Sequence, residues 1–170
     1  MSATNRGAIR NANDHYATPA PAIDALLSVM LIPYNITFLE PCKGEEGRII
    51  ERITCHRRLW CEIAEGFDYL AYQPERRADL IITNPPFSQA LEFLQKSLAE
   101  ADCVIYLLRL NFLESRKRRA FWQANPPTHL LALAERPCFT GDGRTDATGY
   151  GWFCWDKRGF VKLPPGVHVL

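Results

Sequence analysis

Five short apolar runs along the chain alternate with segments in which apolar residues recur at helical spacing. The runs contain many β-branched and aromatic residues and stop at prolines or polar turns, as buried strands do. The predicted strands cover residues 36–40, 59–63, 79–84, 103–108 and 129–134. Predicted helices cover residues 19–30, 47–57, 88–98 and 116–124, with Pro19 in the first turn of the first helix and Ser88 capping the third. The tail predicts a hairpin with strands 150–156 and 160–163.

The alternation of apolar strands and helices is typical of a parallel sheet that is covered on both faces. We therefore predict an α/β fold, a doubly wound and mostly parallel sheet with an antiparallel C-terminal hairpin. The length of 170 residues suits one domain, which we place at residues 15–170 after a flexible segment 1–14. Ligands of such sheets bind at the carboxyl ends of the strands. Three of these ends carry the polar residues Glu40, Glu62 and Asn84.

The tetrapeptide Asn84-Pro85-Pro86-Phe87 follows the third predicted strand and suits chemistry on a planar exocyclic amine. The Asn84 side-chain oxygen and the Pro85 carbonyl can each accept one amine hydrogen, which turns the nitrogen lone pair toward an electrophile. The prolines stiffen the turn, and Phe87 offers a ring face on which a base can stack. Asn125-Pro126-Pro127 repeats the first three residues between a helix and a strand, without the aromatic. The tripeptide alone is therefore compatible with an ordinary proline turn.

The first strand ends in Glu40-Pro41 and is followed by a turn that contains Gly44 and Gly47. Glycines let the backbone approach a ligand closely, and a carboxylate at a strand tip suits an amino group or a sulfonium. The turn lacks the G-x-G-x-x-G pattern that holds a pyrophosphate. Glu62, at the next strand end, can accept from two ribose hydroxyls, and Asp68-Tyr69 can bind an adenine amine and cover its ring. The alternatives are a plain tight turn and solvated surface acids.

The net charge of +1 gives no overall sign of a nucleic-acid partner, since a nucleic-acid-binding domain is usually basic. Residues 109–119 nevertheless carry five basic side chains against one acidic side chain. This segment follows the fourth predicted strand at the ligand-binding edge, so we expect it to contact phosphates. The alternative is a solvated helix start. The basic residues are Arg109, Arg116, Lys117, Arg118 and Arg119.

The six cysteines include no Cys-x-x-Cys pair, so the spacing of a structural zinc site is absent and no metal is expected. Most of them lie inside or beside apolar runs, where a reduced thiol packs as a small hydrophobic group. The first residues are polar rather than a hydrophobic signal segment, and every apolar run is far shorter than the roughly 20 residues of a membrane helix. We therefore expect a soluble, cytoplasmic protein without a membrane partner.

Several motifs together resemble the adenine-specific, S-adenosylmethionine-dependent DNA methyltransferases, especially the small stand-alone enzymes of phages and prophages. The resemblance covers about residues 15 to 157. Its motifs are Tyr16-Ala-Thr18-Pro19, LEPCKGEEG at 39–47, CEIAEGFDYL at 61–70, DLIITNPPF at 79–87, YLLRLNFLES at 106–115 and RPCFTGDGRTDATGYGWFCWD at 136–156. It implies a class I, Rossmann-like methyltransferase fold and transfer of a methyl group from S-adenosylmethionine to the 6-amino group of adenine in DNA.

The resemblance also implies roles for individual residues. Cofactor-binding residues would be Tyr16, Thr18, Pro19, Glu40, Pro41, Gly44, Glu62, Asp68 and Asn84. The target base would be held by the catalytic residues Asn84, Pro85, Pro86 and Phe87. Nucleic-acid contacts would come from the basic residues of segment 109–119 and from a loop over the flipped base that contains Arg136, Phe139 and Asp146.

Two features depart from this family. Two glutamates separate Gly44 from Gly47, where the family has Gly-x-Gly, and the usual target-recognition domain is absent, because residues 88–170 complete the core fold. We expect DNA as the partner in a bacterial or phage-infected cell, and a homodimer could supply a missing recognition surface. The same tetrapeptide also occurs in enzymes that methylate RNA bases or protein glutamine. A third reading is a binding module that keeps the fold without turnover.

Overall fold

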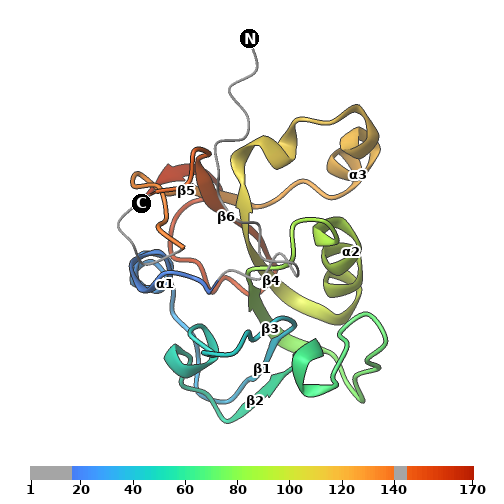
Figure 1. Cartoon of the computed structure of the whole chain (residues 1–170). Coiled ribbons are helices and arrows are strands. Elements are labelled where there is room, and N and C mark those ends of the chain that lie inside the picture. The colour runs from blue at the N-terminus through green and yellow to red at the C-terminus, as the bar shows by residue number, and fades with distance from the viewer. Residues whose placement is uncertain (1–16, 140–144) are drawn as a thin grey trace.

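The computed structural model describes residues 17–139 and 145–170, which form one mixed sheet with helices on both faces (Figure 1). The strands are β1 (Thr37–Glu40), β2 (Arg57–Trp60), β3 (Ala78–Thr83), β4 (Ala101–Arg109), β5 (His129–Ala132), β6 (Tyr150–Asp156) and β7 (Gly166–Val169). The α-helices are α1 (Ala20–Ser28), α2 (Ala90–Glu100) and α3 (Arg119–Ala124). Short 3₁₀ turns cover Ile50–Arg52, Ile63–Glu65, Leu110–Leu113 and Arg116–Arg118.

The sheet has seven strands in the order β2-β1-β3-β4-β6-β5-β7. The first four strands of this order are parallel to one another, because each returns to the same edge after a crossover. Strand β6 is antiparallel to both β4 and β5, and β7 is parallel to β5. This arrangement confirms the predicted α/β, mostly parallel sheet.

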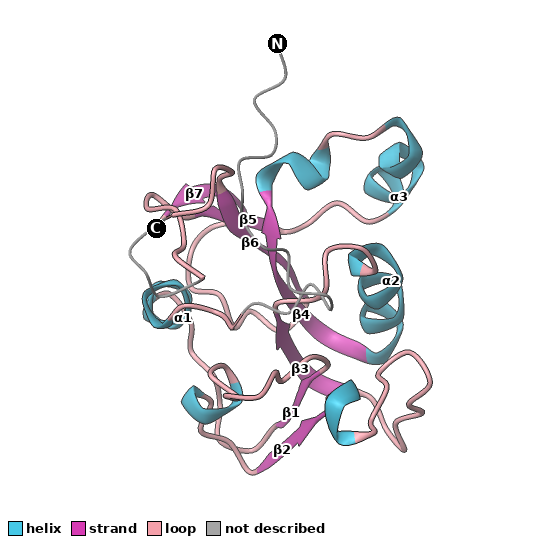
Figure 2. Ribbon diagram, in the orientation of Figure 1, coloured by secondary structure: helices cyan, strands magenta, loops and turns pink. Residues whose placement is uncertain are grey.

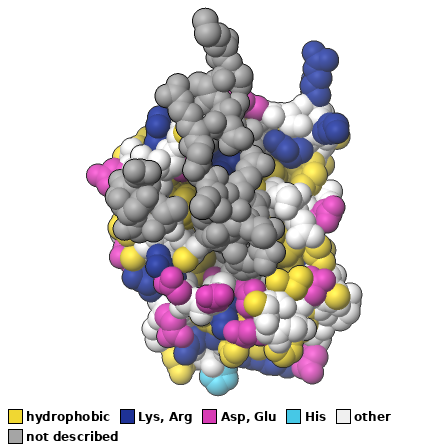
Figure 3. All heavy atoms as spheres, in the orientation of Figure 1, with side chains coloured by type: hydrophobic (Ala, Val, Ile, Leu, Met, Phe, Trp, Pro, Cys, Tyr) yellow, Lys and Arg dark blue, Asp and Glu magenta, His cyan; other side chains and the backbone are white. Residues whose placement is uncertain are grey.

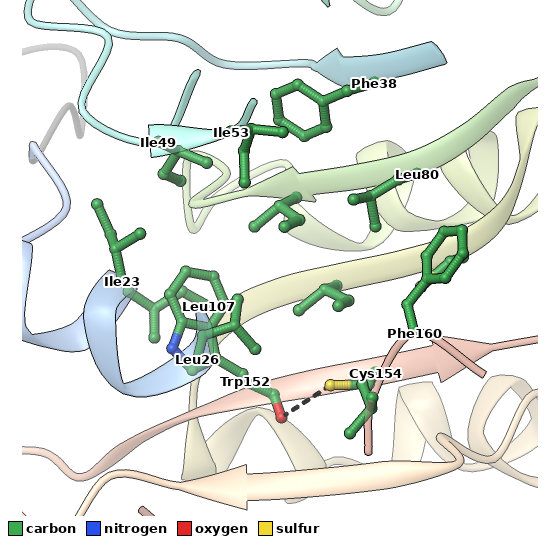
Figure 4. Packing of buried hydrophobic residues seen from close by; sticks show 14 of the residues in the cluster. Ile23, Leu26, Phe38, Ile49, Ile53, Leu80, Leu107, Trp152, Cys154 and Phe160 are labelled. Atoms are coloured by element: carbon green, nitrogen blue, oxygen red, sulfur yellow. Dashed lines mark hydrogen bonds between the residues drawn. The ribbon is translucent and has the colours of Figure 1, made fainter. Parts of the chain in front are cut away.

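The two faces of the sheet carry separate hydrophobic layers. Along β4, Cys103, Ile105 and Leu107 face the layer under α1, whereas the residues between them face the layer under α2. This alternation follows from the two-residue repeat of a strand. Figure 4 shows the α1 side, where Ile23 and Leu26 point toward the sheet, and Figure 1 shows α2 and α3 on the opposite face. The doubly wound arrangement is therefore confirmed.

The predicted helix 47–57 is wrong, because the structure has only the 3₁₀ turn Ile50–Arg52 between β1 and β2 (Figure 2). Gly47 has φ +56°, a left-handed conformation that a regular helix cannot contain. The Ile50 N–H donates to a carboxylate oxygen of Glu40 at 2.9 Å rather than within a helix. The segment still buries the apolar residues that suggested a helix, including Ile49 and Ile53.

The predicted second hairpin strand, residues 160–163, does not pair with β6. Val161 forms an isolated bridge with Met30, and the Asp156 carboxylate accepts the Val161 N–H at 2.8 Å. The backbone of residues 160–162 is bound instead to residues 29–31, just after α1. The last strand, β7, lies further along and pairs in parallel with β5.

Other predicted elements are confirmed with shifted ends. Strand β2 covers 57–60 rather than 59–63, so Glu62 lies just beyond it. Helix α2 begins at Ala90 after Gln89, so Ser88 is not its cap. All six cysteines are free thiols. In the described ranges, no helix has the length and apolar character needed to cross a membrane.

Candidate active site

The carboxyl ends of β2, β1 and β3 bring the predicted acids and the Asn84 tetrapeptide to one edge of the sheet. Glu40 is the last residue of β1, Glu62 follows β2 by two residues, and Asn84 directly follows β3. The three strands are adjacent and parallel, with β1 in the middle. At the usual spacing of neighbouring strands, β2 and β3 are roughly 10 Å apart. A small molecule can therefore reach all three strand ends at once.

Glu40 has a buried carboxyl group at the centre of this edge. Its side chain is only 1% exposed, and one oxygen accepts the Ile50 N–H. Burial raises the pKa of Glu40 from 4.5 to about 9, although the nearby Lys43 opposes the shift. The group is thus mainly protonated at neutral pH unless a positive charge comes close. Such a carboxyl is a binding group for a cation that enters the site.

The turn after β1 contains two glycines in the left-handed conformation. Gly44 has φ +67° and Gly47 has φ +56°, which explains the glycine at each position. The Gly44 N–H donates to Glu62 at 2.7 Å, so the turn is bound to the neighbouring strand end. A Cβ on Gly44 would meet no atom within 4 Å. The backbone at Gly44 therefore borders open space beside both acids.

Glu62 is held at the mouth of this space by two backbone amides. Its oxygens accept from the N–H groups of Gly44 and Ala64, at 2.7 and 3.1 Å. The side chains of Ile63 and Phe67 next to it are 65% and 57% exposed. These two apolar groups can cover a flat ring, a role that the sequence reasoning missed. The sequence shows two apolar residues close to the strand-end acid Glu62. Only the fold shows that both are exposed.

The predicted role of Tyr69 as a cover for an adenine ring is wrong. Its ring is buried under α2, and its hydroxyl bonds to Ser97 at 2.9 Å and to Glu100 at 3.0 Å. Asp68 is exposed, and its carboxylate accepts the Leu70 N–H at 2.9 Å. Asp68 thus follows the 3₁₀ turn after Glu62, and its carboxylate stabilises its own loop.

The segment before α1 lies beside the glycine turn, as expected for cofactor contacts. The Thr18 carbonyl accepts from the Arg48 guanidinium at 3.5 Å, and both Thr18 and Pro19 are buried. Pro19 immediately precedes α1. Pro41 is buried directly after Glu40. Tyr16 lies outside the described residues.

Asn84, Pro85, Pro86 and Phe87 form the turn between β3 and α2, at the same edge as Glu40. Phe87 is half-buried, and the Arg109 guanidinium lies 4.3 Å from its ring centroid. This distance is well within the range of a cation–π contact. Arg109 ends β4, the strand next to β3, so sheet order alone brings the two residues together. One face of the predicted stacking ring is thus covered by a basic side chain.

Arg109 is fixed by a hydrogen-bonded triangle with the first residue of β6. Its Nε donates to the Tyr150 hydroxyl at 2.9 Å, and that hydroxyl donates to Asp146 at 2.6 Å. Asp146 also accepts from Arg109 Nη2 at 3.3 Å. Burial raises the pKa of Tyr150, so its hydroxyl remains a donor at neutral pH. Phe139 packs on Tyr150 with ring centroids 5.0 Å apart, which brings this part of the predicted loop to the site.

The predicted phosphate contacts fall into two groups in the structure. Arg118 donates to the Phe112 carbonyl at 2.8 Å and stacks on that ring at 4.2 Å, so it holds its own loop together. Arg116, Lys117 and Arg119 are exposed near α3, away from the acids at the β1 and β2 ends. Arg136 is exposed on the segment before Phe139. Figure 3 shows basic side chains over the α3 region, and acidic side chains interspersed with basic ones over the β1–β2 end of the same face.

Comparison with known proteins places the fold. No protein-family profile and no curated protein matches the sequence. Among solved structures, a protein from Pyrococcus horikoshii assigned as an RNA methyltransferase is 16% identical, with a TM-score of 0.62 over 84% of this chain and 86% of its own. A dimethyladenosine transferase from Plasmodium falciparum is 9% identical, with a TM-score of 0.59 over 82% of this chain.

A class I S-adenosylmethionine-dependent methyltransferase from Listeria monocytogenes is 12% identical, with a TM-score of 0.61 over 94% of this chain. This chain spans 62% of the Plasmodium protein and 66% of the Listeria protein. At these identities the likeness concerns the fold. The chain has the class I methyltransferase fold, as its motifs implied.

Proposed function

We propose that the chain transfers a methyl group from S-adenosylmethionine to the exocyclic 6-amino group of adenine in DNA. The observation that carries this proposal is the position of Asn84-Pro85-Pro86-Phe87 at the end of β3, beside the acids that end β1 and β2. Amine acceptors, a stacking ring and a site for a cationic ligand then share one edge of a methyltransferase fold.

The residues at the β1 and β2 ends fit S-adenosylmethionine. Glu40 offers a buried carboxyl for the amino group, and ionises when that positive charge arrives. Glu62 binds the ribose hydroxyls, and the Gly44 backbone borders the space in which the ligand lies. Ile63 and Phe67 cover the adenine ring. When bound, the cofactor supplies a methyl group made electrophilic by its sulfonium.

The chain itself positions the amine. The Asn84 side-chain oxygen and the Pro85 carbonyl each accept one hydrogen of the 6-amino group, so the nitrogen becomes more tetrahedral and directs its lone pair toward the cofactor side. The adenine stacks on Phe87, a contact worth about 1–3 kcal/mol. The N–CH3 bond would form as the S–CH3 bond breaks to leave a neutral thioether. The excess proton would then pass from the nitrogen to water, so no residue must act as a base beforehand.

Arg109 contacts both the proposed base-binding ring of Phe87 and the hydrogen-bonded triangle with Tyr150 and Asp146. A base that stacks on the covered face of Phe87 displaces the guanidinium, which lies 4.3 Å from the ring. The Arg109 side chain also donates to the Tyr150 hydroxyl and to the Asp146 carboxylate, which limit how far it moves. It can then lie over the base or meet its phosphate.

RNA is the second candidate substrate. Of the solved structures that share the fold, one is assigned as an RNA methyltransferase and another is a dimethyladenosine transferase. The amine-holding geometry of Asn84 and Pro85 suits adenine in either nucleic acid. The 2′-hydroxyl distinguishes the two substrates, and it lies away from the reacting nitrogen.

The test uses methyl-labelled S-adenosylmethionine with DNA, RNA and protein offered separately. Asn84→Ala and Phe87→Ala are expected to abolish transfer to DNA while cofactor binding, measured by calorimetry, stays largely intact. Asn125→Ala is the matched control, because Asn125 begins a second Asn-Pro-Pro segment that lies between α3 and β5. Full transfer by the Asn84 and Phe87 variants would refute the assignment, and label in RNA or protein alone would move it to those substrates.

A further inference from the structure

A shallow, open groove of about 470 Å³ lies at α3, in the part of the chain that follows Arg109 and β4. It is lined by Leu113, Ser115, Arg116, Arg119, Trp122 and Gln123. These residues come from the two 3₁₀ turns after β4 and from α3. The proposed methyl transfer does not use this groove, so its lining needs a separate explanation.

The two arginines of the groove are available for an anion. Arg116 and Arg119 are exposed, and neither forms an ion pair with any residue in the described part of the chain. Arg118 between them is used differently, since it donates to the Phe112 carbonyl and stacks on the Phe112 ring. That contact fixes the loop that carries the groove. Arg116 and Arg119 therefore place two guanidinium charges along the groove, without an ion-pair partner among the residues that the structure describes.

The other four lining residues are two apolar ones, Leu113 and Trp122, and two polar ones, Ser115 and Gln123. Trp122 is held by neighbouring rings, with Trp155 stacked at 6.1 Å and 10° and Phe112 edge-on at 5.8 Å. Leu113 is 40% exposed beside it. A rigid apolar floor under two guanidinium groups matches a nucleotide, which has a flat base and a charged phosphate. Single-stranded nucleic acids are bound in this way, by stacking on apolar rings within a basic groove.

The groove lies within reach of a neighbour of the target base. Arg109 contacts Phe87, and the turn Leu110–Leu113 that follows Arg109 ends at Leu113, which lines the groove. Figure 1 shows this turn between β4 and α3. Four residues of 3₁₀ helix rise about 8 Å. A strand whose target base lies at Phe87 can therefore place an adjoining nucleotide at Arg116 and Arg119.

We propose that this groove binds an unpaired nucleotide of the substrate strand, with its base against Leu113 and Trp122 and its phosphate between Arg116 and Arg119. The proposal rests on the nucleic-acid substrate of the proposed function. A base in the groove cannot remain paired. The enzyme therefore binds single strands, or locally opened duplexes, better than intact duplex.

The experiment measures binding of fluorescein-labelled oligonucleotides of one mixed sequence by anisotropy, over a series of salt concentrations. Single-stranded DNA, single-stranded RNA and duplex DNA are compared. Arg116→Ala and Arg119→Ala should weaken single-strand binding, and each should reduce the slope of log K against log salt by about 0.7. Arg76→Ala is the matched control, because Arg76 is exposed before β3 and does not line the groove. It should change the binding constant and the slope much less.

A second readout tests contact with the groove floor. A bound single strand should quench tryptophan fluorescence, and Trp122→Phe should remove most of that quenching. Equal effects of Arg116→Ala and Arg76→Ala would overturn the groove as a specific site. Failure of the wild-type chain to bind any oligonucleotide would overturn it too, and so would tighter binding of the duplex. Asn84→Ala separates the two proposals, since it should lose methyl transfer while its remaining strand binding still depends on Arg116 and Arg119. If the wild type binds single strands but methylates no substrate, and Arg116→Ala weakens that binding, only the proposed function is refuted.

Discussion

Glu40 is the residue whose chemistry depends most on the fold. Any strand-end glutamate looks alike in a sequence, but here burial shifts the protonation equilibrium of the carboxyl by placing it at the centre of the sheet edge. A buried carboxyl that is neutral in the absence of ligand favours a cationic ligand, whose arrival compensates the cost of ionisation. The position of Glu40 therefore links cofactor binding to pH.

The pH dependence of stability tests this state of Glu40. Because its pKa is about 9 in the folded chain and ordinarily 4.5, the folded state binds more protons between these values. The contribution of Glu40 to the free energy of unfolding is therefore complete below about pH 4.5 and is lost as the pH rises toward 9. Glu40→Gln keeps an acceptor for the Ile50 N–H but cannot ionise.

The measurement is urea unfolding of the wild type and of Glu40→Gln at pH 5, 7 and 9. The stability of the variant relative to the wild type should increase over this series. Parallel profiles for the two proteins would show that Glu40 ionises normally. Affinity for S-adenosylmethionine should fall in the variant at every pH, because the charge that binds the amino group is missing.

Tyr150 is a second residue whose role appears only in the structure. The sequence places it at the start of a strand, and the antiparallel register of β6 brings it opposite Arg109. Tyr150→Phe removes a hydroxyl that accepts from Arg109 and donates to Asp146. We expect a loss of about 1–3 kcal/mol in the free energy of unfolding, since buried partners lose their hydrogen bonds.

Tyr72→Phe is the control for that variant. The Tyr72 hydroxyl makes no hydrogen bond with the described residues, and its ring is half-buried. Its removal should change stability by less than about 0.5 kcal/mol. If urea unfolding gives the same small change for both tyrosines, the triangle does not stabilise the fold.

At the scale of elements, the strands were predictable and the connections were not. The runs at 79–84 and 103–108 are apolar on both faces, and this pattern indicates a central strand that is covered on both sides. The segment 47–57 has isoleucines at helical spacing, but the left-handed Gly47 and the bond from Ile50 to Glu40 are tertiary features. The prediction of a hairpin in the tail was wrong for the same reason. Residues 160–162 pair with the residues that follow α1, which are far away in sequence.

The candidate site was predictable to the same extent. Glu40, Glu62 and Asn84 follow from one rule about strand ends, and the order of the strands confirms that they share an edge. Which aromatic residue is exposed near Glu62 could not be predicted. Phe67 and Tyr69 are two residues apart in the sequence, but the first faces solvent and the second is buried under α2.

The glycine turn gives a prediction at this scale. Gly44→Ala places a side chain at φ +67° and in the space that borders both acids. Gly159→Ala is a close match, with φ +68° and no atom within 4 Å of its Cβ, but it lies in the turn after β6. Each should lose about 1 kcal/mol of stability from the left-handed conformation.

The difference between these variants lies in ligand binding. Gly44→Ala should reduce the affinity for S-adenosylmethionine, because the ligand is proposed to lie against that backbone, whereas Gly159→Ala should bind as the wild type does. Calorimetric titration of the wild type and of both variants with S-adenosylmethionine measures these affinities. Equal affinity in Gly44→Ala and Gly159→Ala would place the cofactor elsewhere.

At the scale of the whole molecule, charge separation explains a net charge of only +1. The β1 and β2 ends, where a cationic cofactor is proposed, carry acidic groups among basic ones, whereas the surface over α3, where the strand is proposed to lie, is basic (Figure 3). The total charge averages these two regions and therefore conceals both. The mostly parallel sheet produces the separation, since it brings different strand ends to one edge in a fixed order.

The most direct test of the central claim is nucleoside analysis by mass spectrometry. Random-sequence DNA and RNA are incubated with the protein and S-adenosylmethionine, digested to nucleosides, and compared with samples treated with Asn84→Ala. Methyl transfer to the 6-amino group of adenine predicts N6-methyladenine in the DNA treated with the wild type and none in the DNA treated with the variant. Methylation confined to another base or position, or equal methylation by the variant, would contradict it.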